Sequence, residues 1–429
     1  MVKPLRLFPL FCATLLMAQE PDPGGTAKKA LDLFLGGKFA ELNQMFSPSS
    51  KVERNGVVPY SESALAKLGA TVKEYGDVEK IGQPSVSAMG PISAVSIPVQ
   101  FARQTINFTV YINAEGQIVQ MYLRQAQAIW THPDYFKQGV FQEREVTVGS
   151  DEWKLPGTLT YPAGKTGSPT VVLVPDSGPS DRDATQFAIK VFGDLADGLS
   201  SRGIAVLRYE KRMRQYATKM SSTSYTIDDD TVHDAVEAVA LARAQPEVDP
   251  KRVYVLGFGV GGYIAPRIAG DDGKLAGLVL LGAPEHSLED LILETAISLG
   301  VTGTQLEMIK HQVAEIKKLE GGDTDLPKRL GLPVAYWLDL KGYDAAADAR
   351  KLAIPMLILQ GGRDFQVGPA EFDAWKAAKA KGNNVITKSY PSLNHLFVAG
   401  EGKSTEQEYR KPGHVSAEVI DDIAKFVNP

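Results

Sequence analysis

The 429-residue sequence contains a single cysteine. This residue, Cys12, lies within the first 18 residues. If that segment is removed on export, the remaining chain can form no disulfide, present no thiolate nucleophile and offer no cysteine ligand to a metal. The six histidines show no metal-ligand spacing with carboxylates. We therefore expect no metal and no other cofactor, and we expect packing to stabilise the fold.

The sequence also has no surplus of positive charge. It has 46 Lys and Arg against 51 Asp and Glu, a formal net charge of −5. Proteins that bind nucleic acid neutralise phosphates with basic side chains, so nucleic acid is not expected as a partner. The length and the 44% hydrophobic content indicate a folded chain of two or three domains with a large buried core.

A long hydrophobic run occurs at the very start of the sequence. Lys3 and Arg6 form a short positive region, residues 7–17 are mostly apolar, and the small residue Ala18 suits a cleavage site. This order predicts a signal peptide over 1–18 and hence an exported protein, periplasmic or extracellular. The run is too short to span a bilayer comfortably, so we expect no stable membrane span after cleavage. An uncleaved anchor is the alternative.

The hydrophobic pattern divides the remaining chain into two parts. Apolar residues at helical spacing predict short helices over 27–35 and 39–46. From 95 to 123 the apolar residues recur at every second position, which predicts an antiparallel meander. We therefore expect a small α+β domain over 24–127, followed by a linker over 128–142.

Residues 143–429 open with a predicted hairpin and then alternate between short apolar strands and helices. Unbroken apolar runs are typical of strands in a parallel sheet that is covered on both faces. The pattern predicts a mostly parallel, doubly wound sheet, interrupted by a helical cap inserted at about 288–343. Two of the predicted helices are 184–200 and 231–245, and the predicted strands are 171–174, 203–209, 253–257, 277–282, 355–361 and 385–390.

Three strand ends carry the residues that we expect to form a site. In an open α/β sheet, ligands bind beyond the carboxyl ends of the strands. One strand runs into the tight turn Gly257–Gly262 and a helix, a later strand leads to Asp364, and the last leads to His395. A strand–turn–helix followed by an aspartate and then a histidine is the chain order of the α/β-hydrolase triad.

Further motifs accompany this order. They are LPGTLT at 155–160, SGP at 177–179 with DRD at 181–183, the strand 203–209 with Lys211-Arg212, Tyr336-Trp337, QGGRD at 360–364 and LNH at 393–395. With these motifs, residues 141–429 resemble secreted bacterial α/β-hydrolase esterases of the serine aminopeptidase-like group. Several members of that group carry a small N-terminal domain of unknown function, like the one expected at 24–127.

The resemblance implies an α/β-hydrolase fold and an ancestry in carboxylic-ester hydrolysis. In that scheme His395 is the general base and Asp364 orients it. The backbone N–H groups of Ser177 and Val260 form the oxyanion hole. Asp181, Arg182, Asp183, Arg208, Lys211 and Arg212 are expected to form ion pairs behind the site rather than to bind substrate.

The sequence departs from the family where the nucleophile belongs. The family's turn reads Gly-His-Ser-x-Gly-Gly, whereas this chain has Phe258 in place of the histidine and Gly259 at the nucleophile position. Without a hydroxyl no acyl-enzyme can form. Loss of the nucleophile of such a triad costs ~10⁶ in kcat.

A second departure lies in the oxyanion loop. The family's loop begins His-Gly-Ser-Gly-Pro, and this chain reads Pro175-Asp176-Ser177-Gly178-Pro179. A carboxylate at 176 opposes the negative charge that develops in ester hydrolysis, unless its own charge is neutralised. We count Asp176, Phe258 and the cap residues Tyr336 and Trp337 as candidate binding residues, although the two cap residues could also simply anchor the cap.

These observations predict a pseudo-hydrolase that keeps a pocket for a small ester, acyl or peptide-like ligand. One alternative is an active hydrolase that uses Ser177 or Ser392 as a surrogate nucleophile, or water activated by His395. Another is a nucleotide-binding protein, since Gly257-x-Gly259-x-x-Gly262 also matches the dinucleotide fingerprint, with Glu285 near the position of a ribose-binding acid.

Overall fold

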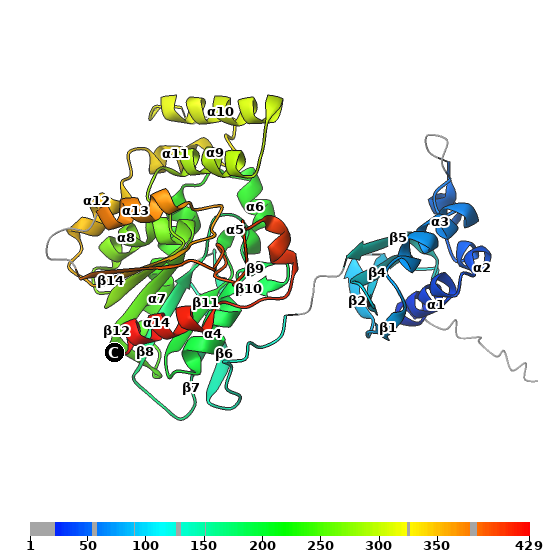
Figure 1. Cartoon of the computed structure of the whole chain (residues 1–429), viewed down its shortest axis with the longest axis horizontal. Helices are drawn as coiled ribbons and strands as arrows, with labels where there is room; N and C mark the ends of the chain where they lie inside the picture. The colour runs from blue at the N-terminus through cyan, green and yellow to red at the C-terminus, as the bar shows by residue number, and fades with distance from the viewer. Residues whose placement is uncertain are drawn as a thin grey trace, which may run out of the picture. The chain divides into compact units, whose positions relative to one another are not determined.

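The computed structural model describes residues 22–53, 58–89, 91–125, 130–150, 152–323, 327–377 and 384–429. The chain divides into two units, Met1–Gln127 and Ala128–Pro429, which Figure 1 shows in blue to cyan and in green to red. The predicted signal peptide 1–18, with Lys3, Arg6, Cys12 and Ala18, lies outside the described residues.

The first unit packs helices against an antiparallel sheet. Its sheet order is β1-β3-β4-β5, and β2 also pairs with β3. Alternate residues of β3 and β4, such as Val95, Ile97 and Phe108, are fully buried in a core shared with α1. The sequence pattern had not indicated α3, β1 or β2. The elements are α1 Pro23–Leu35, α2 Phe39–Gln44, η1 Pro48–Lys51, α3 Glu62–Lys73, β1 Val78–Ile81, β2 Ser85–Met89, β3 Ile92–Phe101, β4 Thr105–Ile112 and β5 Ile118–Gln125.

The second unit is built on one larger sheet. Among the described residues its order is β15-β14-β13-β12-β8-β11-β7-β6. All neighbours from β11 to β15 are parallel, whereas β6 and β7 form the predicted hairpin and β7 is antiparallel to β11. The strands are β6 Phe141–Val148, β7 Leu155–Pro162, β8 Ser168–Val174, β11 Ala205–Tyr209, β12 Val248–Phe258, β13 Gly277–Leu281, β14 Met356–Gly361 and β15 Val385–Tyr390.

Helices cover both faces of this sheet. Val172 and Val174 of β8 share a core with α7 (His233–Arg243) and α8 (Val260–Asp272), while Val171 and Leu173 share a second core with α4 (Val191–Ser200) and α14 (Ala417–Val427). Successive side chains of a strand point to opposite faces of the sheet. Because helices cover both faces here, the β8 side chains on each face are buried. This explains why these strands read as unbroken apolar runs.

Three helices of the predicted cap lie between β13 and β14, drawn in yellow in Figure 1. The predicted helix 184–200 starts later than expected, because Ala184 and Phe187 have φ of 49° and 52° and the segment forms two short strands. The remaining elements are β9 Thr185–Gln186, β10 Ile189–Lys190, α5 Arg212–Gln215, α6 Ala217–Ser222, η2 Asp228–Val232, α9 Leu288–Ser298, α10 Gly303–Lys318, α11 Val334–Leu340, α12 Ala345–Lys351, α13 Pro369–Ala377 and η3 Glu406–Arg410.

Part of the predicted linker packs on the second unit. Trp130 Nε1 donates to Asp194 Oδ1 at 2.8 Å, and the Tyr135 hydroxyl donates to the Val415 carbonyl at 2.8 Å. The described residues of this segment therefore belong structurally to the second unit, and β6 starts before the segment ends.

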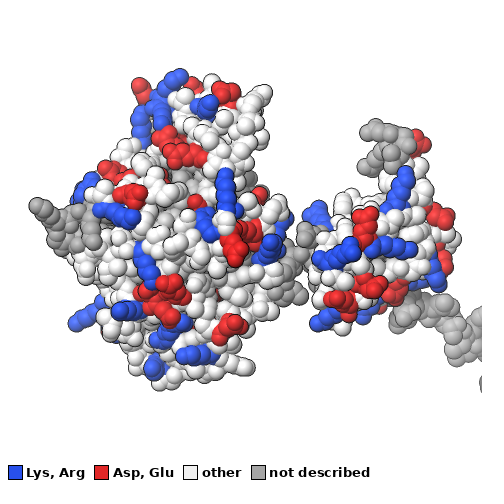
Figure 2. All heavy atoms as spheres, viewed as in Figure 1, with Lys and Arg blue, Asp and Glu red and all other residues white. Residues whose placement is uncertain are grey.

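The surface mixes charges of both signs. In the view of Figure 2, Lys and Arg are interspersed with Asp and Glu over both units. Over the described part of the chain, no helix has the length and apolar character needed to cross a bilayer.

Candidate active site

The carboxyl ends of four parallel strands of the second unit bring the candidate residues together. β8 leads to Asp176 and Ser177, β12 to Gly259, β14 to Asp364 and β15 to His395. This is the edge of an open α/β sheet where ligands bind.

The turn between β12 and α8 is sharp. Gly259 has φ 55° and ψ −122°, a conformation that glycine adopts with little steric cost. At Gly261 an added Cβ would lie closer than 3.0 Å to the carbonyl oxygen of Val174, so the start of α8 approaches β8 more closely than a side chain allows. The backbone thus keeps the strained turn on which the resemblance expects a nucleophile.

His395 and Asp364 form a buried pair. Both are almost fully buried, at 1% and 7% exposure. His395 Nδ1 donates to Asp364 Oδ2 at 2.7 Å, and Gln360 Nε2 donates to the same oxygen at 3.1 Å. Asp364 Oδ1 accepts from the backbone N–H groups of Gln366 and Val367 at 2.8 and 2.9 Å. These contacts fix the carboxylate, which in turn fixes the imidazole.

The Asp176 carboxylate occupies the place expected for the reaction's negative charge. Its Oδ1 accepts hydrogen bonds from the backbone N–H groups of Val260 at 2.8 Å and of Ser177 at 2.7 Å. Its Oδ2 lies 3.8 Å from His395 Nε2. A Cβ added at Gly259 would come closer than 3.0 Å to the carboxyl carbon of Asp176. One side chain therefore fills both the predicted oxyanion hole and the space of a nucleophilic side chain.

The charges at this point stabilise one another. Burial opposes the charged form of His395, but Asp364 and Asp176 outweigh it and raise the pKa of His395 to about 10. Burial also opposes ionisation of Asp176, but His395 and the N–H groups of Val260 and Ser177 hold its pKa below the usual range. At neutral pH the site therefore contains an imidazolium between two carboxylates.

Lys211 holds the backbone of the loop that carries Asp176. This lysine is 2% exposed, and its Nζ donates to the Asp176 carbonyl oxygen at 2.9 Å. The same Nζ forms an ion pair with Asp230 Oδ2 at 3.0 Å. The Lys211 backbone N–H donates to the Ser180 carbonyl at 3.1 Å, which ties the loop at a second point.

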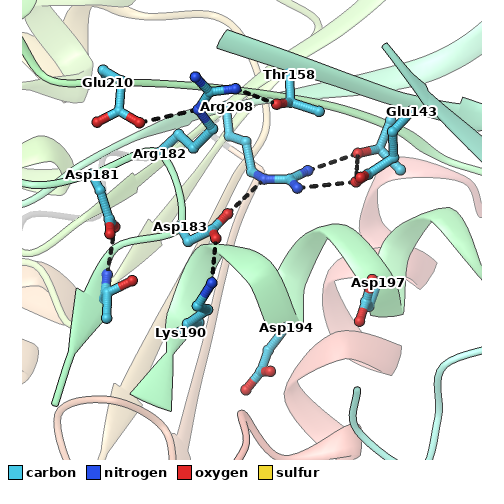
Figure 3. A network of polar contacts seen from close by, with 12 residues as sticks. Glu143, Thr158, Asp181, Arg182, Asp183, Lys190, Asp194, Asp197, Arg208 and Glu210 are labelled. Atoms are coloured by element: carbon cyan, nitrogen blue, oxygen red, sulfur yellow. Dashed lines mark hydrogen bonds and ion pairs between the residues drawn. The ribbon is translucent and has the colours of Figure 1, made fainter. Parts of the chain in front are cut away.

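A network of ion pairs supports the following part of the loop. Figure 3 shows Arg208 between Glu143 and Asp183, with Lys190 on the other oxygen of Asp183. The Arg208 distances are 3.0 Å to each carboxylate, and the Lys190 distance is 2.8 Å. Arg182 pairs with Glu210 at 3.1 Å and with Glu145 at 2.7 Å.

The prediction that these charged residues form ion pairs is confirmed for Arg182, Asp183, Arg208 and Lys211, and also for Arg212, which pairs with Asp234. Asp181 differs, because its Oδ1 accepts from the Thr185 backbone N–H at 2.8 Å. None of these side chains is among those that line the cavity.

A cavity of about 170 Å³ opens beside Asp176 and His395. Its wall is mainly apolar and includes one face of the cap helix α9, which the sequence analysis had not singled out. The lining residues are Asp176, Ser177, Gly259, Val260, Pro284, Leu288, Leu291, Ile292, Thr295, Gln366, Val367 and His395.

Three of the candidate binding residues are not among those that line this cavity. Phe258 is fully buried and packs its ring on the imidazole of His395, with 4.8 Å between ring centroids. Tyr336 and Trp337 are each 2% exposed within the core beneath the cap. Trp337 Nε1 donates to the Arg329 carbonyl at 2.9 Å. Phe258 contacts the imidazole, and Tyr336 and Trp337 anchor α11, which was the alternative expected for the two cap residues.

In the described part of the chain, no serine hydroxyl is hydrogen-bonded to the imidazole of His395. His395 Nε2 is buried and has no hydrogen-bond partner there. Ser177 lines the cavity but meets Asp176 through its backbone N–H, and Ser392 is exposed. The same part of the chain offers no group of three His, Cys, Asp or Glu side chains that could hold a metal ion.

The glycine-rich turn offers no open phosphate site at its first N–H. The Val260 N–H at the start of α8 is directed at Asp176 Oδ1. A phosphate at this helix N-terminus would meet a carboxylate instead of free N–H donors.

Comparison with known proteins identifies the family. Esterase EstD of Thermotoga maritima is 37% identical to this chain over 372 residues, which cover 86% of this chain and 87% of EstD. The chain belongs to the family of this esterase. No protein-family model matches it.

Solved structures are similar at lower identity. An arylesterase is 14% identical, with 70% of this chain and 87% of that chain covered and a TM-score of 0.45. An esterase of Pyrococcus furiosus is 15% identical, with 70% and 96% covered and a TM-score of 0.44. A chain of Bacteroides ovatus described as a candidate dipeptidyl aminopeptidase IV is 15% identical, with a TM-score of 0.49. The match covers 80% of this chain but only 42% of the Bacteroides chain.

Membership of the EstD family confirms the predicted α/β-hydrolase fold of the esterase type, and the sheet order agrees with it. Within this esterase family, the chain combines a buried His–Asp pair with an aspartate that takes up the oxyanion donors.

Proposed function

We propose that this member of the EstD family does not hydrolyse carboxylic esters through an acyl-serine, and that its site binds a small, largely apolar molecule. One observation carries the proposal: the Asp176 carboxylate occupies both oxyanion donors and the space next to Gly259. An ester carbonyl placed here would find neither an attacking hydroxyl nor a free N–H for its oxyanion.

The cavity supports a small ligand rather than an extended one. Its volume is about 170 Å³ and most of its lining side chains are apolar. A cavity of roughly 150 Å³ holds a molecule of the size of benzene. The cap helix α9 contributes Leu288, Leu291 and Ile292 to the wall, so substitutions there are expected to change which ligand fits.

A fluorophosphonate probe tests the proposal without a guess at the substrate, because it labels any activated serine. We expect no labelling of the wild-type protein and no measurable hydrolysis of p-nitrophenyl acetate. Stoichiometric labelling at Ser177 or Ser392 would overturn the proposal and establish a surrogate nucleophile.

A matched positive control is the double variant Gly259→Ser/Asp176→Gly, which restores the family's residues at both positions. It provides a hydroxyl and frees both N–H donors. If this variant is labelled and the wild type is not, the absent hydroxyl and the occupied N–H donors explain why the wild type is not labelled. A collapsed site would then be excluded as the cause.

We also propose that the protein is exported, on the basis of the charged, apolar and small-residue order of 1–18. Cell fractionation of the tagged full-length chain is expected to place a shortened product outside the cytoplasm. An uncut product in the cytoplasm would contradict this.

A further inference from the structure

The two oxygens of Asp176 have different surroundings. Oδ1 is held by two backbone N–H groups, from Val260 and Ser177. Oδ2 forms an ion pair with His395 Nε2 at 3.8 Å and belongs to a side chain that lines the cavity. The side chain is 21% exposed, so a molecule in the cavity can reach it.

This arrangement matches what a carboxylate nucleophile needs. Carboxylates form covalent ester intermediates in several enzyme classes. If Oδ2 becomes esterified, hydrolysis of that ester must place negative charge on Oδ1. The Val260 and Ser177 N–H groups already point at Oδ1 and would stabilise this charge without rearrangement.

We propose that Asp176 is a catalytic nucleophile, and that the chain hydrolyses small apolar epoxides to diols through an ester intermediate on Asp176. The inference goes beyond the proposed function. It rests on the absence of serine chemistry, which leaves Oδ2 of Asp176 as the candidate nucleophile at the cavity wall.

In the first step Oδ2 attacks a ring carbon of the epoxide, and a new C–O bond forms. The ring C–O bond breaks, and its electron pair remains on the epoxide oxygen. That oxygen takes the proton from His395 Nε2, a buried N–H with no other partner in the described chain. The products are a hydroxyalkyl ester on Asp176 and a neutral His395.

In the second step neutral His395 takes a proton from water, and the resulting hydroxide attacks the carboxyl carbon of Asp176. The charge moves to Oδ1, between the N–H groups of Val260 and Ser177. The tetrahedral intermediate expels the diol oxygen, which takes the proton back from His395. The new carboxylic acid at Asp176 then gives its proton to His395. The balance is one epoxide and one water consumed and one diol formed.

The surroundings of Asp176 favour an epoxide over an ester or an anion. A substrate carbonyl has no free oxyanion donor, because Asp176 Oδ1 occupies both. An anionic substrate would meet the Asp176 carboxylate at the cavity wall. A neutral molecule with a strained ring needs only the nucleophile, a proton donor and an apolar pocket. The first two are Asp176 and His395, and Leu288, Leu291 and Val367 contribute to the third.

Oxygen transfer tests the proposal directly in the full-length wild-type protein. An excess of enzyme is mixed with 1,2-epoxybutane, 1,2-epoxyhexane or styrene oxide in ¹⁸O-water. The masses of the diol and of the peptide containing Asp176 are then measured by mass spectrometry. We expect the first-turnover diol to carry unlabelled oxygen and Asp176 to gain one heavy oxygen. Label found only in the diol would show direct attack by water and overturn the proposal.

Trapping of the intermediate provides the second test. Rapid acid quenching of the wild-type protein, mixed in excess with one epoxide, should trap an adduct of one epoxide on Asp176. His395→Gln removes both the acid of the first step and the base of the second, so we expect this variant to give neither adduct nor diol. Asp176→Asn should abolish both adduct and turnover, by at least 100-fold. The matched control Asp421→Asn makes the same charge change on α14, at a carboxylate that is 64% exposed and outside the cavity, and should retain wild-type turnover.

An adduct on another residue, or neither adduct nor oxygen exchange with all three epoxides, would overturn the inference. The failure of this inference can be distinguished from the failure of the proposed function. Fluorophosphonate labelling of wild type would overturn the loss of serine chemistry, whereas missing epoxide chemistry would leave an unlabelled protein and remove only the nucleophilic role of Asp176.

Discussion

At the scale of single residues, the site is governed by the charges of Asp176 and His395. The imidazolium is stabilised by two carboxylates, and the Asp176 carboxylate by the imidazolium and two N–H groups. Loss of the Asp176 charge, by substitution or by esterification, removes one of the two groups that raise the pKa of His395. The pKa of His395 then falls, so the imidazole is neutral and able to accept a proton at a lower pH.

We predict that Asp176→Asn lowers the pKa of His395 in the folded protein. In wild type, the pKa of His395 is raised to about 10, above the ordinary value of about 6.5. NMR titration of the imidazole should show a charged ring through pH 8 in wild type and an earlier transition in the variant. A transition at the same pH in both proteins would contradict the proximity of the two groups.

The same shift predicts a dependence of stability on alkaline pH. Because folding raises the pKa of His395, its contribution to the free energy of unfolding is fully present below about pH 6.5 and is lost as pH rises through about 10. Urea unfolding from pH 6 to pH 11 should show a steeper loss of stability in wild type than in Asp176→Asn. Equal slopes would contradict the assignment of the shift to this pair.

We predict that Gly259→Ser alone gives an inactive and less stable protein. The added Cβ would collide with the carboxyl carbon of Asp176, and serine would also have to adopt a φ of 55°. The strained backbone costs about 1–3 kcal/mol. Thermal unfolding should therefore show a lower Tm for the single variant, and Asp176→Gly in the same chain should recover part of the loss. Rapid fluorophosphonate labelling of the single variant would show that Asp176 moves aside freely.

At the scale of elements, the loop after β8 depends on β11 and the residues that follow it. Arg208 lies on β11 and Lys211 two residues beyond this strand, and both hold loop 176–190 through charged contacts. The position of Asp176 is thus set by a strand that is its neighbour in space and about thirty residues away in sequence.

We predict that Lys211→Met is strongly destabilising, because it leaves the 2%-exposed Asp230 without its cation and the Asp176 carbonyl without its donor. Breaking a buried ion pair from one side costs about 3–5 kcal/mol. Urea unfolding should show this loss, and Lys211→Met/Asp230→Asn should recover much of it. The exposed Lys310, which pairs with Glu307 on α10, provides the control, since Lys310→Met should change stability by less than about 0.5 kcal/mol.

At the scale of the whole molecule, the boundary of the second unit lies inside the predicted linker. Asp194 is fully buried and accepts from Trp130, and Asp197 is 5% exposed and pairs with His132 at 2.7 Å. Both acidic side chains come from α4, which is central to one of the two cores. The segment that begins at Trp130 is therefore part of what stabilises the sheet unit.

We predict that a chain starting at residue 130 unfolds at the same temperature as the second unit of the full protein, and that one starting at residue 140 unfolds several degrees lower. The shorter chain loses the hydrogen bonds to two buried carboxylates, at about 1.5–3 kcal/mol each. Calorimetry of both chains would measure the difference. Equal melting temperatures would place the boundary after residue 139.

The sequence by itself determined the strands of the larger sheet, their order of appearance, and the pair of Asp364 and His395. Unbroken apolar runs predicted β8, β13 and β14 because a strand buried on both faces has no polar side. Residues that follow parallel strands must meet at one edge of the sheet, which placed Asp364 near His395 before any distance was known. The local pattern missed β9 and β10, where positive φ values at non-glycine residues end the helical pattern.

Only the tertiary structure decided where the Asp176 carboxylate points. The sequence predicted that the charge of the Asp176 carboxylate opposes ester hydrolysis. The orientation of this carboxylate depends on the Lys211 contact, on the N–H groups at the start of α8 and on the space left at Gly259. Likewise, the burial of Tyr336 and Trp337 depends on how the cap packs. Hydrophobic period and chain order are properties of neighbouring residues, whereas the direction of a buried charge is set by partners that only folding brings within hydrogen-bond distance.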